Sequence, residues 1–305
     1  MKKFVLLGGM PRSGTTLLET VIGSNSRISI PPGDLPFAEQ YAKGLSVEKI
    51  FEVLAKKSTW DLWEEKNFDA LLNADHGTAF RESMRAYATK VGKDIPAAKT
   101  PYAEFFYDIY IDWLRDYDVK FVHIVRNPFD VLASLKKSHI HTNWRVFTDT
   151  LEVQAKNWQR STVLGLARSF ALPDNYFVIK YEDFVQDPQT QGSRICEFLG
   201  IEFEEERMLN RADYAYHDTN SSFADGSPET RKDSPYIYRS TSRKSFLDEA
   251  EIALVVDSCG EAAAALGYDD PDFVCRSPMY ASKMKSSTRL KRKASRMVGR
   301  LFGSR

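Results

Sequence analysis

The segment GGMPRSGTT, close to the N-terminus, has the residue types of an anion-binding loop. Gly9 and Gly14 have the separation of the two glycines in the phosphate-binding pattern G-x-x-x-x-G-K-[ST]. Thr15 stands where that pattern has its lysine, and Thr16 supplies the hydroxyl. Backbone N–H groups in such a loop, together with the positive end of the following helix, attract an anion whatever the side chains are. We therefore predict that the loop binds a phosphate-like group; the alternative is a tight turn from strand to helix.

The loop lacks what a nucleoside triphosphatase needs. Such an enzyme places a lysine on the β- and γ-phosphates and holds magnesium with an aspartate at the end of a strand. Thr15 removes the lysine, and the next strong apolar run, VKFVHIVR, ends in Arg126, which cannot ligate a metal. The positively charged side chain of this loop is instead Arg12. What remains can neutralise the 5′ end of a nucleotide without a metal.

Arg126 and Ser134 predict a second anion site. Arg126 ends a predicted strand, and open α/β sheets bind their ligands at the carboxyl ends of strands. Ser134 follows eight residues later, about two turns into the next predicted helix, and can return to the same side. An arginine at the end of a strand is common by itself, so the argument depends on the pair of sites.

Three segments, in this order, resemble the PAPS-dependent sulfotransferases, whose donor is 3′-phosphoadenosine-5′-phosphosulfate (PAPS). PRSGTT, residues 11–16, matches the family's loop for the 5′-phosphosulfate, and VRNPFDVLAS, residues 125–134, matches the segment for the 3′-phosphate. KYEDFVQDP, residues 180–188, followed by ICEFLG, matches the third segment, whose tyrosine lies near the nucleotide. An arginine in the first loop resembles the bacterial and tyrosylprotein branches. Leu17 departs from the cytosolic type, which has a base-stacking tryptophan there.

The resemblance implies a reaction and a set of donor-binding residues. A sulfuryl group would pass from PAPS to an acceptor hydroxyl of a sugar, lipid, phenol or peptide tyrosine, by in-line displacement without a metal. Arg243 falls where family members return a late basic segment to the 3′-phosphate; a solvated loop charge is the alternative. The implied donor-binding residues are Arg12, Ser13, Gly14, Thr15, Thr16, Arg126, Ser134, Tyr181 and Arg243.

The resemblance also implies catalytic residues, beginning with Arg12 at the leaving phosphate. Lys99, in AAKTPY, resembles the family lysine that reaches the transferring group; a solvated lysine before a helix is the alternative. Tyrosylprotein relatives place a glutamate base about twenty residues past the loop arginine, where this chain has Gly33 and then Asp34. A one-residue slip lets Asp34 serve as the base, and a solvated Pro-Gly-Asp turn is the alternative.

Histidines compete with Asp34 for the role of general base. His139 and His141, in KKSHIHTNW, are the strongest competitors because they adjoin the predicted donor-binding helix. His76 and His217 are weaker ones, and His123, inside the apolar run FVHIVR, is predicted to be buried and structural.

The elements that must position these residues predict a three-layer α/β fold. FVLLGG is a non-alternating apolar run, typical of a parallel strand buried on both faces, and TTLLETVIGS after the loop predicts a helix. VKFVHIVR and NYFVIKYEDF predict further strands, with helical segments between and after them. This order predicts a P-loop-type fold with a central parallel sheet flanked by helices. We assign residues 1–282 to a single sulfotransferase-like domain, with a helical excursion at 46–100 and a lid loop at 210–245.

The formal charge of zero conceals an uneven distribution. Residues 283–305 carry nine Lys and Arg and no acid, whereas residues 1–282 carry 33 bases against 42 acids. The apolar side chains of this tail fall on one helical stripe, which predicts a basic amphipathic helix suited to an anionic membrane surface. Docking on the acidic body and disorder are the alternatives. Nucleic acid is not predicted as a partner, because the wide basic, aromatic-lined surface is missing.

Composition predicts a cytoplasmic protein, peripheral at the inner membrane surface if the tail binds there. The three cysteines lack metal-ligand spacing and predict reduced thiols. No apolar run is close to the length of a membrane-spanning helix, about 18 residues. The short apolar run at the N-terminus is not predicted to be a signal peptide. Two other functions stay open. One is a P-loop NTP-dependent kinase. The other is a non-catalytic nucleotide-binding or membrane-adaptor protein, favoured by Gly33, which weakens the case for a base.

Overall fold

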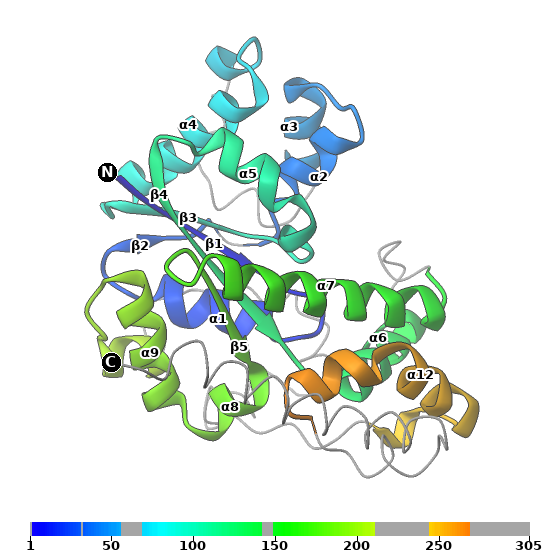
Figure 1. Ribbon diagram of the computed structural model, residues 1–305. Helices are drawn as coiled ribbons and strands as arrows, with labels where there is room; N and C mark the ends of the chain where they lie inside the picture. Colours follow the sequence, from blue (N-terminus) through cyan, green and yellow to red (C-terminus); the bar gives the residue numbers. More distant parts are fainter. Residues whose placement is uncertain (1, 32, 56–68, 142–148, 211–243, 269–305) are drawn as a thin grey trace, which may run out of the picture.

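The structure, a computed structural model, describes residues 2–31, 33–55, 69–141, 149–210 and 244–268. Within them, five strands form one sheet in the order β2-β3-β1-β4-β5, and every neighbouring pair is parallel (Figure 1). All carboxyl ends therefore meet at one edge, where ligands of open α/β sheets bind. The strands are β1 (Lys2–Gly8), β2 (Ile28–Ser29), β3 (Ile95–Lys99), β4 (Tyr117–Val125) and β5 (Tyr176–Lys180).

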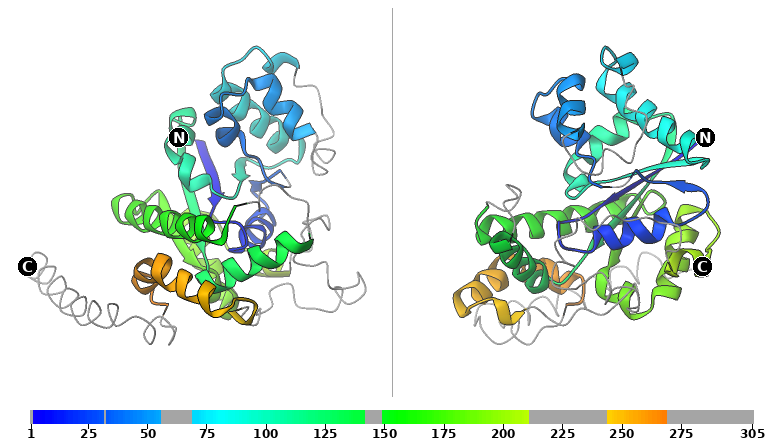
Figure 2. Two further views of the ribbon diagram at one scale, coloured as in Figure 1. Left: turned by 90° about the vertical axis from the view of Figure 1, so that its right-hand side faces the viewer. Right: turned by 180° about the vertical axis from the view of Figure 1, so that it is seen from behind.

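Helices cover both faces of this sheet (Figure 1; Figure 2). One face packs on α1 (Thr15–Gly23), α9 (Pro188–Leu199) and α10 (Glu205–Asn210). The other face packs on α2 (Phe37–Ala42), α3 (Val47–Ala55), α4 (His76–Lys90) and α5 (Tyr107–Trp113). These two layers and the sheet between them confirm the predicted three-layer α/β fold.

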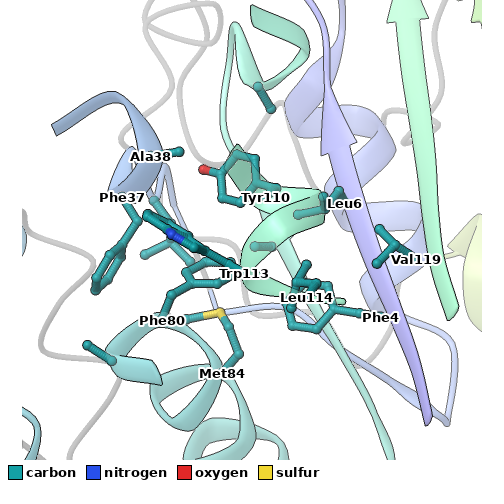
Figure 3. Packing of buried hydrophobic residues seen from close by; sticks show 14 of the residues in the cluster. Phe4, Leu6, Phe37, Ala38, Phe80, Met84, Tyr110, Trp113, Leu114 and Val119 are labelled. Atoms are coloured by element: carbon teal, nitrogen blue, oxygen red, sulfur yellow. The ribbon is translucent and has the colours of Figure 1, made fainter. Parts of the chain in front are cut away.

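Buried aromatic side chains fill the second of these faces; they include Phe37, Phe51, Phe80, Tyr107, Tyr110, Trp113 and Phe121. Figure 3 shows Phe80, Tyr110 and Trp113 gathered against Phe4 and Leu6 of β1. The ring of Phe80 lies 5.6 Å from that of Phe4 and 5.3 Å from that of Tyr110, the spacing of favourable aromatic pairs. This packing holds the helical layer on β1 and so supports the strand that leads into the glycine loop.

A third group of helices packs together near the carboxyl ends of β1 and β4. It consists of α6 (Pro128–His141), α7 (Leu151–Ala171) and α12 (Glu249–Ala265), which share a core that includes Met10 from the glycine loop. One of them, α7, also runs over β4 and β5. Short segments complete the described fold: η2 (Asp69–Leu71), η3 (Ala103–Phe106), α8 (Tyr181–Gln186) and η6 (Lys244–Phe246).

Several helices begin and end where their sequences predict. Asp187 accepts a hydrogen bond from the Thr190 N–H at the start of α9, and Gly200, with a φ of 61°, ends it. Asp248 and Glu251 form a capping box at the start of α12. These local signals account for the agreement between predicted and observed helices in the second half of the chain.

The structure differs from the predicted elements in two places. The range predicted as a helical excursion, 46–100, ends in β3, because Ala97 and Ala98 are buried within the sheet beside β1. NYFVIKYEDF, predicted as a strand, remains extended only to Lys180 and continues as the helix α8. Most of the predicted lid loop and the whole basic tail lie outside the described residues, so the domain division stays a prediction. None of the described helices has the length and hydropathy of a bilayer-spanning segment.

Candidate active site at the carboxyl edge of the sheet

The loop between β1 and α1 has the backbone of an anion-binding loop. Gly9, Arg12 and Gly14 have φ angles of 135°, 72° and 102°. Gly14 precedes α1, and no described side chain caps the first turn of this helix, so its first N–H groups are available to an anion. Ser13 is buried, and its hydroxyl has no hydrogen-bond partner among the described residues. A buried polar atom of this kind, in such a loop, fits a bound anion.

The first two segments singled out in the sequence meet at this loop. The Arg12 guanidinium donates from Nε to the Ser134 hydroxyl at 3.0 Å, which joins the loop to α6. Arg126, which follows β4 directly, donates from Nη1 to the Arg12 carbonyl at 3.3 Å. The two predicted anion sites therefore adjoin each other, and Arg12 lies between them.

The third segment contacts both of the others. The Tyr181 ring, at the start of α8, lies 4.4 Å from the Arg126 guanidinium. A Cβ added to Gly14 would lie 2.6 Å from the Tyr181 ring, so only glycine fits between the loop and this tyrosine. The chain thus brings three segments, the first and last of them more than 160 residues apart, into one cluster of side chains.

Arg126 is held in place by neighbours on four elements. Its side chain is nearly buried, with Nη2 3.7 Å from the Asp130 carboxylate. Its carbonyl accepts the Trp158 indole N–H at 2.9 Å. The next backbone N–H, of Asn127, donates to Glu182 at 2.8 Å, and Glu182 also accepts the Tyr268 hydroxyl at 2.7 Å. The end of β4 is therefore preorganised by groups from α6, α7, α8 and the segment after α12.

The proposed catalytic residues Lys99 and Asp34 meet on the other side of the loop. β3 pairs with β1 so that Lys99 lies beside Leu7, two residues before the glycine loop. The Lys99 ammonium lies 2.5 Å from Asp34 and 2.9 Å from Glu19 of α1. Glu19 also accepts the Gly33 N–H at 3.1 Å. Lys99 and Glu19 are buried, whereas the Asp34 side chain is 34% exposed.

Burial and charge act against each other in this group. Burial alone would lower the pKa of Lys99, but the charges of Asp34 and Glu19 raise it above its ordinary value. Burial raises the pKa of Glu19, and the Lys99 charge offsets that only in part. The ammonium is therefore charged at neutral pH and is shared by two carboxyl groups, one enclosed and one open to solvent.

A second buried polar cluster supports the start of the loop. Glu104, in η3, accepts the Gly9 N–H at 3.0 Å and the Ser161 hydroxyl at 2.5 Å. Ser161 also lies 3.2 Å from the His123 ring, whose other nitrogen lies 2.9 Å from the Tyr176 hydroxyl. Burial lowers the pKa of His123, so this residue is neutral at pH 7. It is a buried, hydrogen-bonded part of the sheet, as predicted.

The remaining predicted residues are placed as follows. Thr15 and Thr16 begin α1 next to the loop. His76 begins α4, where its Nε2 lies 2.8 Å from the Leu45 carbonyl, away from the carboxyl edge of the sheet. The side chains of His139 and His141, and the whole of His217 and Arg243, lie outside the described residues.

Glu19 and Glu104 are the two site residues that the sequence analysis missed. Glu19 had one sequence signal, since it is the one charged residue in the helix TTLLETVIG. Glu104 had none, because its partner Gly9 lies 95 residues away. Together the two carboxylates hold the loop and the Gly33–Asp34 turn by their backbone N–H groups.

The protein is thus an α/β protein in which a glycine loop, two arginines and one tyrosine gather beside a lysine–carboxylate group at the carboxyl edge of the sheet. The model of the Sulfotransferase family matches residues 5–205 of this chain. The chain belongs to that family of enzymes. The resemblance predicted from the three segments is therefore confirmed.

Solved structures and curated relatives agree with this assignment. The sulfotransferase domain of the Synechococcus PCC 7002 olefin synthase is 20% identical and has a TM-score of 0.57, over 88% of this chain and 96% of that one. The sulfotransferase domain from the curacin biosynthetic pathway is 17% identical, with a TM-score of 0.56, over 88% and 99% of the two chains. These likenesses show the fold.

The curated relatives are longer than this chain. A protein of Aquifex aeolicus (strain VF5) described only as uncharacterized is 24% identical over 280 residues, which is 89% of this chain and 34% of that protein. Carbohydrate sulfotransferase 1 of Rattus norvegicus is 29% identical over 97 residues, 28% of this chain and 24% of that protein. The chain thus spans about a third or less of the length of these relatives.

Proposed function

We propose that the protein transfers a sulfuryl group from PAPS to an acceptor hydroxyl. The observation that carries this proposal is the contact of Arg12 with Ser134, with Arg126 and Tyr181 beside them. Two adjoining anion sites suit a donor that has phosphate at both ends of one nucleoside. A single anion site would suit a nucleoside triphosphate equally well.

The residues present fit that donor. The loop N–H groups, the Ser13 hydroxyl and Arg12 would hold the 5′-phosphosulfate, and Arg126 and Ser134 would hold the 3′-phosphate. Arg12 already contacts Ser134, so its guanidinium is within reach of both ends. Arg243 and the lid loop are proposed to complete the nucleotide side.

Sulfuryl transfer resembles phosphoryl transfer and is promoted mainly by positioning and electrostatics. The acceptor oxygen would form its bond to sulfur while the bond from sulfur to the 5′-phosphate oxygen breaks. The electron pair would leave with adenosine 3′,5′-bisphosphate, whose developing charge Arg12 and the loop stabilise. Lys99 would stabilise the transferring group, and the acceptor's proton would pass to Asp34. The half-exposed position of Asp34, against the burial of Lys99 and Glu19, supports this choice of base.

The acceptor is proposed as a hydroxyl of a sugar, lipid, phenol or peptide tyrosine. Similarity to a protein named carbohydrate sulfotransferase, although limited to part of the chain, makes sugar hydroxyls the first to test. Residues 283–305 are proposed to bind an anionic membrane surface and hold the enzyme there. Deleting them should abolish binding to vesicles containing anionic lipid, and unchanged binding would reject that role.

The test of the proposed function has two stages. Thermal stabilisation should occur with adenosine 3′,5′-bisphosphate in the presence of a chelator, and not with ATP and Mg²⁺. Labelled PAPS is then offered with a library of sugar, phenol, lipid and peptide hydroxyls, and label should appear in one class. Stabilisation by ATP–Mg²⁺ alone would favour a kinase. Binding of the bisphosphate without transfer to any acceptor would favour a non-catalytic nucleotide-binding protein.

A further inference from the structure

Glu19 is a carboxyl group that the proposed reaction leaves without a role. It lies on α1, one turn after Thr15, and its side chain is fully buried. It cannot contact an acceptor, because no part of it reaches the surface. Burying a carboxyl group is costly unless it is paired and hydrogen-bonded, and two partners of Glu19 belong to the proposed catalytic group: Lys99 itself and the backbone directly before Asp34.

These partners are the Lys99 ammonium, at 2.9 Å, and the Gly33 N–H, at 3.1 Å. Gly33 precedes Asp34 directly and has a φ of 90°, a conformation that glycine adopts without strain. Glu19 therefore fixes the backbone from which Asp34 projects and the lysine that Asp34 contacts. Because Glu19 lies on α1, it also connects Lys99 and the Gly33–Asp34 turn to the helix that begins directly after the anion loop.

The charges lead to the same conclusion. With Glu19 ionised, the group carries one positive and two negative charges. A proton taken up by Asp34 would then leave Lys99 neutralised by Glu19. Without Glu19, the same proton would leave a buried ammonium with no countercharge in the group, which is strongly unfavourable. Glu19 would thus make Asp34 a better proton acceptor than a lone lysine–aspartate pair allows.

We propose that Glu19 is a positioning residue of this site, which holds Lys99 and the Gly33–Asp34 turn and shares the lysine's charge so that Asp34 can accept a proton. This inference rests on the proposed function, in which Asp34 is the base. Besides one another, the described titratable groups that face these three residues include Tyr87 of α4, whose pKa is raised by burial and then by the Glu19 charge.

The test follows Asp34 directly, without any need for an acceptor. Carboxyl carbons of aspartate are labelled with ¹³C, the Asp34 signal is assigned by Asp34→Asn, and its titration is recorded in the full chain. In Glu19→Gln the amide can still accept the Gly33 N–H, but Lys99 then acts on Asp34 alone. The midpoint of the Asp34 titration should fall by roughly 1 pH unit. Glu82→Gln, an exposed change on α4, is the matched control and should leave it in place.

An unchanged or raised midpoint in Glu19→Gln would overturn the inference and leave Glu19 a structural residue. If that variant does not fold, the double variant Glu19→Gln, Lys99→Met removes both charges together. Its Asp34 midpoint should lie above the wild-type value, because Lys99 contacts Asp34 directly, but below that of Lys99→Met alone, in which the Glu19 charge still acts on Asp34. Equal midpoints in the double variant and in Lys99→Met would show that the Glu19 charge does not act on Asp34.

Turnover gives a second readout once an acceptor is known. Glu19→Gln should lower kcat roughly 3- to 10-fold and move the acidic limb of the pH–rate profile to lower pH, with KM for PAPS unchanged. Failure of the wild-type enzyme to transfer sulfuryl to any acceptor would reject the proposed function. The Asp34 titration would still report on Glu19, so the two failures are distinguishable.

Discussion

Two buried carboxylates lie on opposite sides of the glycine loop, and their surroundings differ in one respect. Glu104 and Glu19 each accept a backbone N–H, from Gly9 and from Gly33 respectively. The Glu104 cluster is closed around its carboxylate: Ser161, His123 and Tyr176 are all buried with it, and its described link to the surface is Arg168, which donates to the Glu104 backbone carbonyl and not to the carboxylate. The Glu19 cluster is open, because the contacts of its carboxylate continue through Lys99 to Asp34, whose side chain is 34% exposed.

This difference separates a structural network from a site for chemistry. A closed network of satisfied hydrogen bonds contributes a fixed loop geometry and has no group that a substrate can reach. An open network holds a charged group, here the Asp34 carboxylate, where a substrate can reach it. The two clusters therefore predict different losses: changes in the open one should reduce turnover, and changes in the closed one should reduce stability.

The largest expected effect comes from breaking the open cluster at Lys99. Lys99→Met should lower turnover about 10²- to 10³-fold, the typical loss when one preorganised donor to a developing charge is removed. Affinity for adenosine 3′,5′-bisphosphate should change little, because Arg12 and Arg126 are intact. Steady-state rates with labelled PAPS, and calorimetric titration of the bisphosphate, measure the two effects. Lys49→Met, in an exposed ion pair on α3, is the control. Equal losses in rate and affinity would place Lys99 on the nucleotide side instead.

A smaller effect, of the opposite kind, is expected at Arg126. Arg126→Ala should weaken adenosine 3′,5′-bisphosphate binding roughly 10- to 100-fold, since hydrogen bonds to charged groups contribute about 1.5–3 kcal/mol. Turnover at saturating PAPS should fall less than affinity does. Calorimetric titration measures the affinity, and Arg194→Ala is the control, because it removes a guanidinium of α9 that lies over the Phe177 ring of β5. An unchanged Kd would show that Arg126 does not bind the bisphosphate and that the proposed second anion site is wrong.

Several residues of the site could be predicted from the sequence because each stands in a short, recognisable segment. Arg12, Arg126, Ser134 and Tyr181 stand in contiguous segments at the ends of predicted strands, so their convergence at one edge of a parallel sheet could be expected. The three-layer fold follows from the same alternation of strands and helices. These predictions depend on local patterns, and local patterns were enough for them.

The open cluster needed information that no local pattern holds. Lys99 and Asp34 could each be proposed from the resemblance, but their contact requires β3 to pair beside β1, and IPAAK was read as part of a helical range. Glu19 reads as one polar position on an apolar helix until Lys99 is placed against it. Tertiary packing brings about both the Lys99–Asp34 and the Lys99–Glu19 contact. The structure therefore adds Glu19 to the predicted pair of Lys99 and Asp34.

The smallest expected effect tests the closed cluster through His123. Burial lowers the pKa of its ring below the ordinary value of about 6.5, whereas Glu104 raises it and Arg168 lowers it further. The unfolded chain therefore binds a proton more readily than the folded one. His123 contributes its full stability above about pH 6.5, and that stability is lost as the pH falls below this value, by at most about 1.4 kcal/mol per pH unit. Urea unfolding of the wild type and of His123→Gln at pH 7.5 and 5.5 measures the difference. The variant should be less stable at both values but should lose less on acidification, and equal acid losses in the two proteins would mean that His123 titrates alike in the folded and unfolded chains.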